Sequence, residues 1–217
     1  MPDFLSRRVM MVDTQVRPSD VTKFPIIDAM LRMPREQFVP ADKAEAAYMG
    51  ENFDLAPGRV LLEPRTLAKM IDAIDLRDTD LVLDVACGTG YSSAVMGWIA
   101  EAVVALEGDE ALATEAQAAL SAVAADNVIV VHGAPENGHA ANAPYDVIIV
   151  QGGVETFPDA LVAQLKDGGR AAAIFMQGAL GVVRVGFKRD GRIAWRDAFN
   201  AGAPALAGFE KAAEFTF

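Results

Sequence analysis

The sequence has 217 residues, of which 52% are hydrophobic and 23% are charged, and its formal net charge at pH 7 is −11. This composition predicts a globular chain with a full core and excludes an intrinsically disordered protein. A surface this acidic repels phosphate backbones, so we expect no nucleic-acid partner.

The expected cellular setting follows from features that the sequence lacks. Cys87 is the single cysteine, so an internal disulfide cannot form and a reducing compartment is expected. An apolar run of about 18 residues is absent, as is an apolar signal core near the start, which argues against a membrane span or export. Potential metal ligands do not cluster at the usual spacing. We therefore expect a cytoplasmic protein with no membrane partner and no bound metal.

Residues 1–60 are expected to form a cap on the substrate side of a core made by residues 61–217, and the two parts to pack as one compact unit. Within the cap, Pro25 begins a helix that Pro34 ends. The apolar face of that helix consists of Ile26, Ile27, Met30 and Leu31. The stretch from residue 34 to residue 58 mixes aromatic residues, prolines and charges, which is typical of irregular structure packed over a site.

The centre of the chain is a unit of strand, small-residue turn, helix and second strand. The apolar run Leu81–Leu83 predicts a buried strand that ends at Asp84, and the turn spans Ala86–Gly90. A second apolar run ends in Glu107. In the helix between them, the residues expected to face the sheet are Ala94, Val95, Trp98 and Ile99. This order is the front half of a nucleotide-binding α/β domain.

The turn and the two acids indicate which ligand the unit binds. Gly88 and Gly90 lack a Cβ atom, so the backbone can turn tightly and a ligand can approach it. Glu107 can accept two hydrogen bonds from a ribose diol. Ser93 stands where a dinucleotide fingerprint has its third glycine, and Asp84 would repel a pyrophosphate but suit an ammonium group. These residues predict binding of S-adenosyl-L-methionine, provided that the space beside Gly88 and Glu107 is open.

The remaining elements give the fold class. Helices are predicted over residues 65–74, 109–125 and 158–166, the last of them ended by Gly168 and Gly169. Further strands are predicted over residues 127–132, 145–150, 170–175, 182–187 and 192–195, with a hairpin turn at Asp190-Gly191. The sequence thus predicts a doubly wound α/β fold: a mostly parallel, Rossmann-like sheet with an antiparallel C-terminal hairpin and an N-terminal helical cap.

Several motifs, taken together, resemble those of protein-L-isoaspartate O-methyltransferases. They are the strings Pro34–Pro40, Ala47-Tyr48, Glu63-Pro64, Asp84–Tyr91, Gly133 with Gly138, and Gln164–Gly169. The resemblance extends from about Met11 to Phe187. It implies a class I methyltransferase that uses S-adenosyl-L-methionine to methylate the isoaspartyl carboxylate of a damaged peptide or protein.

The resemblance also implies roles for particular residues. Glu107 would bind the ribose, and Ala134 and Pro135 would flank the adenine. The segment Leu61–Pro64 would close over the methyl group, which places Leu62 and Glu63 at the catalytic positions. The amino-acid end of the cofactor would be lined by Asp84, Ala86, Cys87, Gly88, Gly90 and Tyr91.

Two positions depart from the family pattern. Leu62 stands where the family has a serine, and Ala134-Pro135 replaces Asp-Gly after the third strand. A carboxylate acceptor is already ionised at neutral pH and needs no general base, so the loss of the serine hydroxyl is compatible with methyl transfer. Glu63 can instead serve as the base for a hydroxyl acceptor, or it can pair with Arg59 or Arg65.

Other functions and residue roles stay open at this stage. The alternatives are a methyltransferase of the same fold with another acceptor, and a non-catalytic protein that binds S-adenosylmethionine or S-adenosylhomocysteine. Arg17 is either a clamp for a substrate carboxylate or a surface arginine in a turn. His132 and His139 are expected to be ordinary polar positions rather than catalytic bases, and Cys87 is expected to serve by its small size rather than as a nucleophile.

Overall fold

The computed structural model describes residues 3–211, so the outermost residues of the two predicted parts, 1–2 and 212–217, lie outside it. The chain begins with helix α1 (Phe4–Met11), which continues through a π-helical turn and a 3₁₀ turn into helix α2 (Phe24–Arg32). Helix α2 confirms the helix predicted between Pro25 and Pro34. The 3₁₀ segments Arg35–Phe38 and Ala41–Tyr48 follow.

A small β-hairpin comes next, where irregular structure was expected. Strand β1 (Phe53–Ala56) pairs antiparallel with β2 (Arg59–Leu61), and the hairpin is a separate two-stranded sheet. Its turn is Pro57-Gly58, and Gly58 adopts a φ of 72°, a conformation that glycine takes without strain. The expectation was wrong because four residues mixing an acid with apolar residues give too short a pattern to identify a strand.

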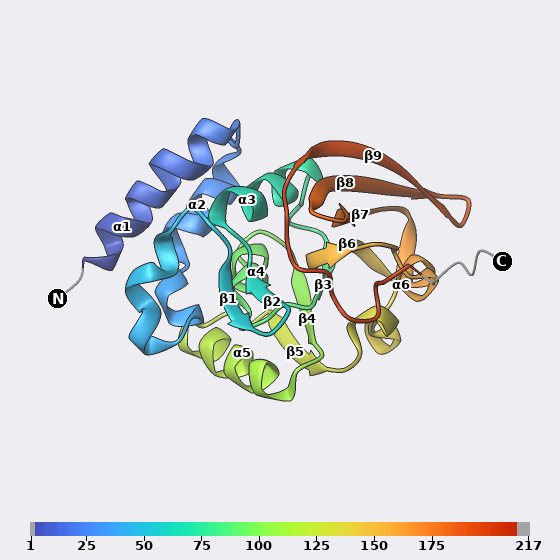
Figure 1. Cartoon of the computed structure of the whole chain (residues 1–217). Helices are drawn as coiled ribbons and strands as arrows, with labels where there is room; N and C mark the ends of the chain where they lie inside the picture. Colours follow the sequence, from blue (N-terminus) through green and yellow to red (C-terminus); the bar gives the residue numbers. More distant parts are fainter. Residues whose placement is uncertain (1–2, 212–217) are drawn as a thin grey trace.

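The main sheet has seven strands in the order β5-β4-β3-β6-β7-β8-β9. They are β3 (Leu81–Val85), β4 (Ala102–Glu107), β5 (Val128–His132), β6 (Tyr145–Val154), β7 (Leu165–Gln177), β8 (Leu180–Arg189) and β9 (Arg192–Asn200). The pairs among β3 to β7 are parallel, and β7-β8-β9 are antiparallel. The predicted fold class is therefore confirmed, including the C-terminal hairpin (Figure 1).

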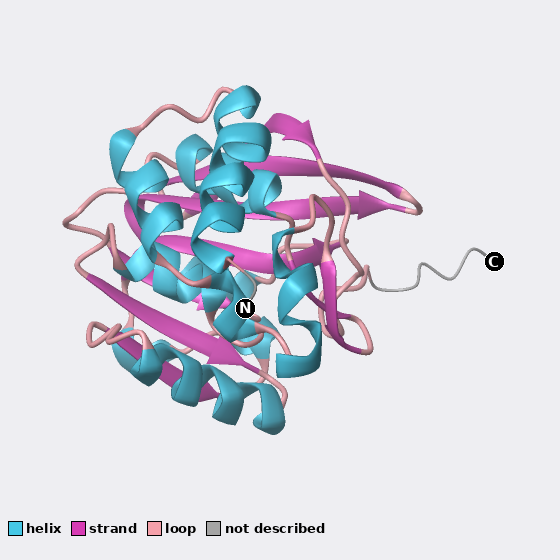
Figure 2. Cartoon of the chain, turned by 90° about the vertical axis from the view of Figure 1, so that its left-hand side faces the viewer, coloured by secondary structure: helices cyan, strands magenta, loops and turns pink. Residues whose placement is uncertain are grey.

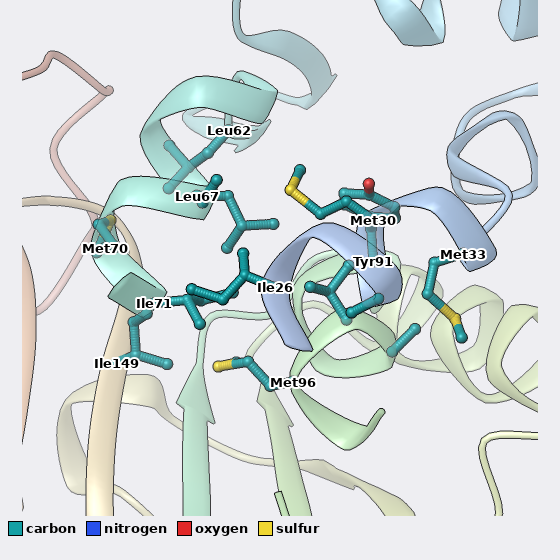
Figure 3. Close-up of a cluster of buried hydrophobic side chains, with 14 of the residues drawn as sticks. Ile26, Met30, Met33, Leu62, Leu67, Met70, Ile71, Tyr91, Met96 and Ile149 are labelled. Carbon is teal, nitrogen blue, oxygen red and sulfur yellow. The ribbon is translucent and has the colours of Figure 1, made fainter. Parts of the chain in front are cut away.

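Alternation along the strands divides the core into two clusters, one on each face of the sheet. Val82 and Val103 belong to one cluster, and their neighbours Leu83 and Val104 belong to the other. The first cluster packs against α1, α2, α3 (Pro64–Ala73), α4 (Tyr91–Gly97) and α5 (Glu110–Ala122), and the second against α6 (Asp159–Gln164). Figure 2 shows the cap and its helices in front of the sheet, and Figure 3 shows the first cluster.

Two details of the predicted helices need correction. Trp98 does not face the sheet: its backbone is still helical at the C-cap of α4, but the indole is 47% exposed, donates its Nε1–H to Asp28 and lies under the Arg32 guanidinium. The helix predicted to run to residue 166 ends at Gln164. The next residue is already extended and pairs with β6, so the strand begins before the glycines that were expected to stop the helix.

A C-terminal segment for which the sequence made no prediction lies beside the carboxyl end of strand β6. Residues 201–210, here called the C-terminal strap, follow β9. Gly153 donates to Pro204 O and accepts from Leu206 N, each at 2.8 Å. Phe209 is fully buried, and its carbonyl accepts from the two residues that follow β6. The strap is therefore fixed beside the carboxyl end of β6.

Between residues 3 and 211, every helix is too short or too polar to cross a bilayer. In the same range, His, Cys, Asp and Glu side chains do not form a group of three that could hold a metal ion.

Gly138 is a position at which a side chain would disturb this frame. Its φ is 64°, and a Cβ atom there would lie 2.5 Å from Gln164 Oε1. Gln164 accepts from His139 N at 2.8 Å and donates to Asn137 O at 2.7 Å. The glutamine thus joins the loop after β5 to helix α6.

We expect Gly138→Ala to lower the free energy of unfolding by about 3 kcal/mol, because left-handed strain adds to the loss of the Gln164 hydrogen bonds. Gly178→Ala is the matched control: its φ is 61°, with no other atoms within 4 Å of the added Cβ. The control should lose only about 1 kcal/mol. Urea unfolding measures both, and equal losses would contradict the role of Gln164.

Candidate active site

The residues singled out from the sequence meet at the carboxyl edge of the parallel strands. Val85 of β3 lies opposite Leu106 of β4, and Glu107 lies opposite His132 of β5. The turn after β3 is joined to β4 by a hydrogen bond from Cys87 N to Leu106 O. The Gly-containing turn and Glu107 are therefore neighbours, at the edge where ligands of open α/β sheets bind.

The turn has a left-handed backbone at three positions. The φ angles are 63° at Ala86, 60° at Gly88 and 91° at Gly90. Glycine adopts this conformation freely, whereas Ala86 is held in it at a cost of about 1–2 kcal/mol. The packing is tight behind the turn, since a Cβ on Gly90 would lie 3.1 Å from Leu120. The two glycines thus meet a backbone requirement.

Asp84 lies beneath the turn and is fully buried. Its carboxylate accepts hydrogen bonds from Ser92 Oγ at 2.6 Å, Ser93 Oγ at 2.5 Å and Gln151 Nε2 at 2.7 Å. Burial raises the pKa of Asp84 to about 6, against the opposing effect of these three donors. The carboxylate thus interacts with protein groups on both oxygens, and contact with a ligand's ammonium group stays a prediction.

These partners of Asp84 were missed from the sequence. Ser93 was read only as the absence of a glycine, although its place in the first turn of α4 directs its hydroxyl to Asp84. Gln151 lies just beyond the strand predicted over residues 145–150, but β6 extends through it. The available signal was the run of small polar residues after the turn, which suits hydrogen bonding to a buried acid.

Glu107 is the second acid of the site and is 1% exposed. Its Oε1 accepts from Gly108 N at 2.8 Å and from Asp109 N at 3.0 Å. Its Oε2 accepts from Gly88 N at 2.6 Å and also from the guanidinium of Arg59. A carboxylate offers about four lone-pair positions, so all of them are engaged.

A cavity of about 410 Å³ opens beside Glu107. Ala134 and Pro135 lie on its wall, so the residues predicted to flank the adenine share one cavity with the acid predicted to bind the ribose. The remaining lining residues are Pro57, Arg59, Gly108, Asp109, Glu136, Leu206, Ala207 and Gly208. The three from the C-terminal strap were missed, because an apolar residue and two small ones in a loop carry no ligand-binding pattern.

The space beside Gly88 is narrower than binding of S-adenosyl-L-methionine requires. A Cβ atom built on Gly88 would lie 2.7 Å from Leu55 Cδ1 of strand β1. The hairpin therefore places Leu55 on Gly88 and Arg59 on Glu107. The adenine suits the chemistry and size of the cavity, whereas Arg59 lies on the acid predicted to bind the ribose and Leu55 lies beside the turn predicted to bind the methionine end.

None of the six residues predicted to line the amino-acid end of the cofactor is among those lining this cavity, and two of them, Tyr91 and Cys87, pack in the first cluster. Tyr91 is fully buried in the first cluster, where its ring contacts Phe38 and lies 4.7 Å from the Arg35 guanidinium. Cys87 is also buried, and burial beside Asp84 raises the pKa of its thiol well above the usual range. A thiolate nucleophile is therefore strongly disfavoured.

The segment at the predicted catalytic positions is held by a buried arginine. Arg35 is fully buried, donates from Nε to Ala47 O at 2.6 Å and from Nη2 to Leu62 O at 2.8 Å. Burial lowers the pKa of this guanidinium. The side chain of Leu62 is 2% exposed and packs in the first cluster (Figure 3). Glu63 accepts from Thr66 Oγ1 at 2.6 Å and pairs with Arg65 at 3.5 Å.

The remaining candidates have local partners. Arg17 is exposed and pairs with Asp13 one turn earlier. His132 is exposed, with Nε2 3.1 Å from Gly108 O. His139 donates its backbone N–H to Gln164. None of these three residues is among those lining the cavity beside Glu107 in the described part of the chain.

The raised pKa of Asp84 makes the stability of the protein depend on pH. The folded state holds the proton more tightly than the unfolded chain, whose aspartate pKa is about 3.9. Its contribution to stability is therefore fully present below about pH 4 and lost as pH rises to about 6. As the pH rises from about 4 to about 6, the free energy of unfolding of Asp84→Asn should therefore increase relative to that of wild type by on the order of 3 kcal/mol.

Urea unfolding of both proteins from pH 4 to pH 7 measures this difference. Asp13→Asn is the control, since this exposed carboxylate pairs with Arg17 one turn away and its loss should change the free energy of unfolding by less than about 1 kcal/mol throughout. A difference between Asp84→Asn and wild type that stays constant over this range would contradict the assignment.

Comparison with known proteins shows which family the chain resembles. The sequence model described as protein-L-isoaspartate(D-aspartate) O-methyltransferase matches residues 8–195. The protein-L-isoaspartate O-methyltransferase of Koribacter versatilis (strain Ellin345) is 36% identical over 167 residues, which cover 77% of this chain and 75% of that one.

Two solved structures show the same fold. A structure of a protein-L-isoaspartate O-methyltransferase superposes with a TM-score of 0.79 at 23% identity. The match covers 94% of this chain and 66% of that one. A Plasmodium falciparum structure described as the same enzyme, in complex with S-adenosyl-L-homocysteine, has a TM-score of 0.77 at 17% identity and covers 95% of this chain and 99% of that one. From the extent of the family match and the identity to its curated relative, the chain belongs to the protein-L-isoaspartate O-methyltransferase family.

Proposed function

We propose that this chain is an S-adenosyl-L-methionine-dependent O-methyltransferase that methylates the free carboxylate of isoaspartyl residues in damaged proteins. The observation that carries the proposal is the cavity at the carboxyl edge of β4 and β5, where Glu107, Ala134 and Pro135 lie together. Membership of the family supports the same reaction and cofactor. The protein acts in the cytoplasm, which the single buried Cys87 supports.

The residues of the site bind and orient more than they transfer protons. Glu107 accepts the ribose hydroxyls, and Ala134 with Pro135 flanks the adenine. S-adenosyl-L-methionine supplies an activated methyl group when bound. The acceptor carboxylate is ionised near pH 7 and needs no base, so the protein's task is to hold it in line with that methyl group.

The segment Leu61–Pro64 orients the acceptor in this proposal. Arg35 fixes its backbone through Leu62 O, and Asn52 Oδ1 accepts from Glu63 N at 2.9 Å. The catalytic positions Leu62 and Glu63 therefore contribute a rigid main chain rather than an acid or a base. Residues 1–60 serve as the cap on the substrate side of the core formed by residues 61–217.

A second candidate is a methyltransferase of the same fold with a hydroxyl acceptor and Glu63 as its base. The contacts of Glu63 favour a structural role, because Thr66 and Arg65 already engage its carboxylate at the start of α3. The replacement of the family serine by Leu62 is the observation that keeps this candidate, since the hydroxyl that the family has at this position is missing.

Methyl transfer to an isoaspartyl peptide tests the proposal directly. The protein is incubated with S-adenosyl-L-methionine labelled in its methyl group and with an isoaspartyl peptide or the matched aspartyl peptide. We expect base-labile label on the isoaspartyl peptide alone, since a carboxyl methyl ester hydrolyses readily in base. Label on neither peptide, with tight binding of S-adenosyl-L-homocysteine, would contradict isoaspartyl methylation and favour another acceptor or a binding protein.

Leu62→Ser restores the hydroxyl at the position that the family uses. We expect isoaspartyl turnover to rise by about threefold to tenfold, as one added hydrogen bond of about 1 kcal/mol allows. Loss of a buried leucine should also lower the free energy of unfolding by about 3 kcal/mol. Leu67→Ser, at a side chain 1% exposed in α3, controls for destabilisation and should not gain activity. Unchanged or lower turnover in Leu62→Ser would contradict the placement of Leu62 at the position of the family's serine.

A further inference from the structure

The β1–β2 hairpin reaches both places that the cofactor has to use. Leu55 of β1 lies where a Cβ atom on Gly88 of the turn would point. Arg59, the first residue of β2, pairs with Glu107. The two contacts come from one small sheet that is separate from the main one. One movement of the hairpin would therefore clear both places together.

The hydrogen bonds of Glu107 show that Arg59 is the group that has to leave. Three of the four donors to this carboxylate are backbone N–H groups, which belong to the turn and to the start of α5. These donors cannot leave without unfolding the turn. A ribose diol brings hydroxyl donors to a carboxylate whose lone pairs are already engaged. The side chain of Arg59 is the only donor that can be exchanged for them among the described residues.

The guanidinium of Arg59 is also incompletely satisfied where it lies. It contacts Glu107 through Nη2, while its buried Nε has no hydrogen-bond partner among residues 3–211. The side chain is 14% exposed and lines the cavity, so it lies within reach of solvent. A buried donor without an acceptor costs free energy, and release of the side chain into water removes this cost.

The hairpin is fixed at its base and free at its turn. Asn52 precedes β1 and bridges Gly202 O at 2.8 Å and Glu63 N at 2.9 Å. Val60 and Leu61 are buried, which anchors β2. No residue of β1 is fully buried, and a Cβ on Gly58 at the tip would meet no atom within 4 Å. Leu55 itself is half-buried and packs against the first cluster, so lifting it breaks the contacts of a partly buried side chain rather than those of a core residue.

We propose that Arg59 sets the cofactor affinity of this chain: it occupies the ribose acid in the ligand-free state, and the ribose displaces it as the tip of the hairpin lifts Leu55 from Gly88. This rests on the proposed cofactor. The pair keeps the buried Glu107 neutralised while the site is free, so the folded chain does not carry an uncompensated buried charge. Part of the binding free energy is used to separate the pair, which weakens observed binding.

Isothermal titration calorimetry with S-adenosyl-L-homocysteine tests this. Arg59→Met keeps the apolar stem but removes the charge and the donors, and it should bind about tenfold more tightly than wild type, because hydrogen bonds to charged groups contribute about that factor. Leu55→Ala should also bind more tightly. Arg59→Lys restores a cation that can pair with Glu107 and should return the affinity to within about threefold of wild type.

The outcomes separate this inference from the proposed function. Arg77→Met, at an exposed arginine paired with Asp75, is the matched control and should bind like wild type. Wild-type binding with equal or weaker binding by a folded Arg59→Met protein would overturn the role of Arg59 and leave the cofactor proposal intact. Absence of binding by every protein at millimolar ligand would overturn the cofactor proposal and this inference with it.

Discussion

The site depends on how the carboxylate of Glu107 is held at the end of β4. Backbone N–H groups of Gly88, Gly108 and Asp109 fix both oxygens, so the acid joins the turn after β3 to the start of α5. The contact with Gly88 is possible because this residue adopts a φ of 60°. A carboxylate fixed by main-chain donors is preorganised for a ligand. Its fourth hydrogen-bond donor is the side chain of Arg59, which can leave.

The central unit could be predicted because its signals are local and independent of each other. Strands β3 and β4 are short apolar runs, each followed by an acid or by small residues, and parallel strands bring their carboxyl ends to one edge. Glu107, Ala134 and Pro135 therefore fell into one cavity, as the sequence and the family resemblance implied. The open space that was expected beside Gly88 was not found, because Leu55 fills it.

The remainder depends on contacts that periodicity does not encode. Arg59 lies 48 positions before its partner Glu107, and an arginine in a short strand gives no sign of which acid it meets. Leu206 of the C-terminal strap likewise reaches the cavity from outside the matched residues. Trp98 was placed on the sheet because helical spacing continues to it, but its indole instead contacts Asp28 and Arg32 of α2. In each case tertiary packing overrides the local pattern.

A crystal structure of the chain with S-adenosyl-L-homocysteine would test the central claim most directly. We expect the ribose hydroxyls within hydrogen-bond distance of Glu107, the adenine against Pro135, and the guanidinium of Arg59 withdrawn from the carboxylate. A nucleoside bound elsewhere would contradict the account, as would one seated in the cavity with the pair between Arg59 and Glu107 unbroken.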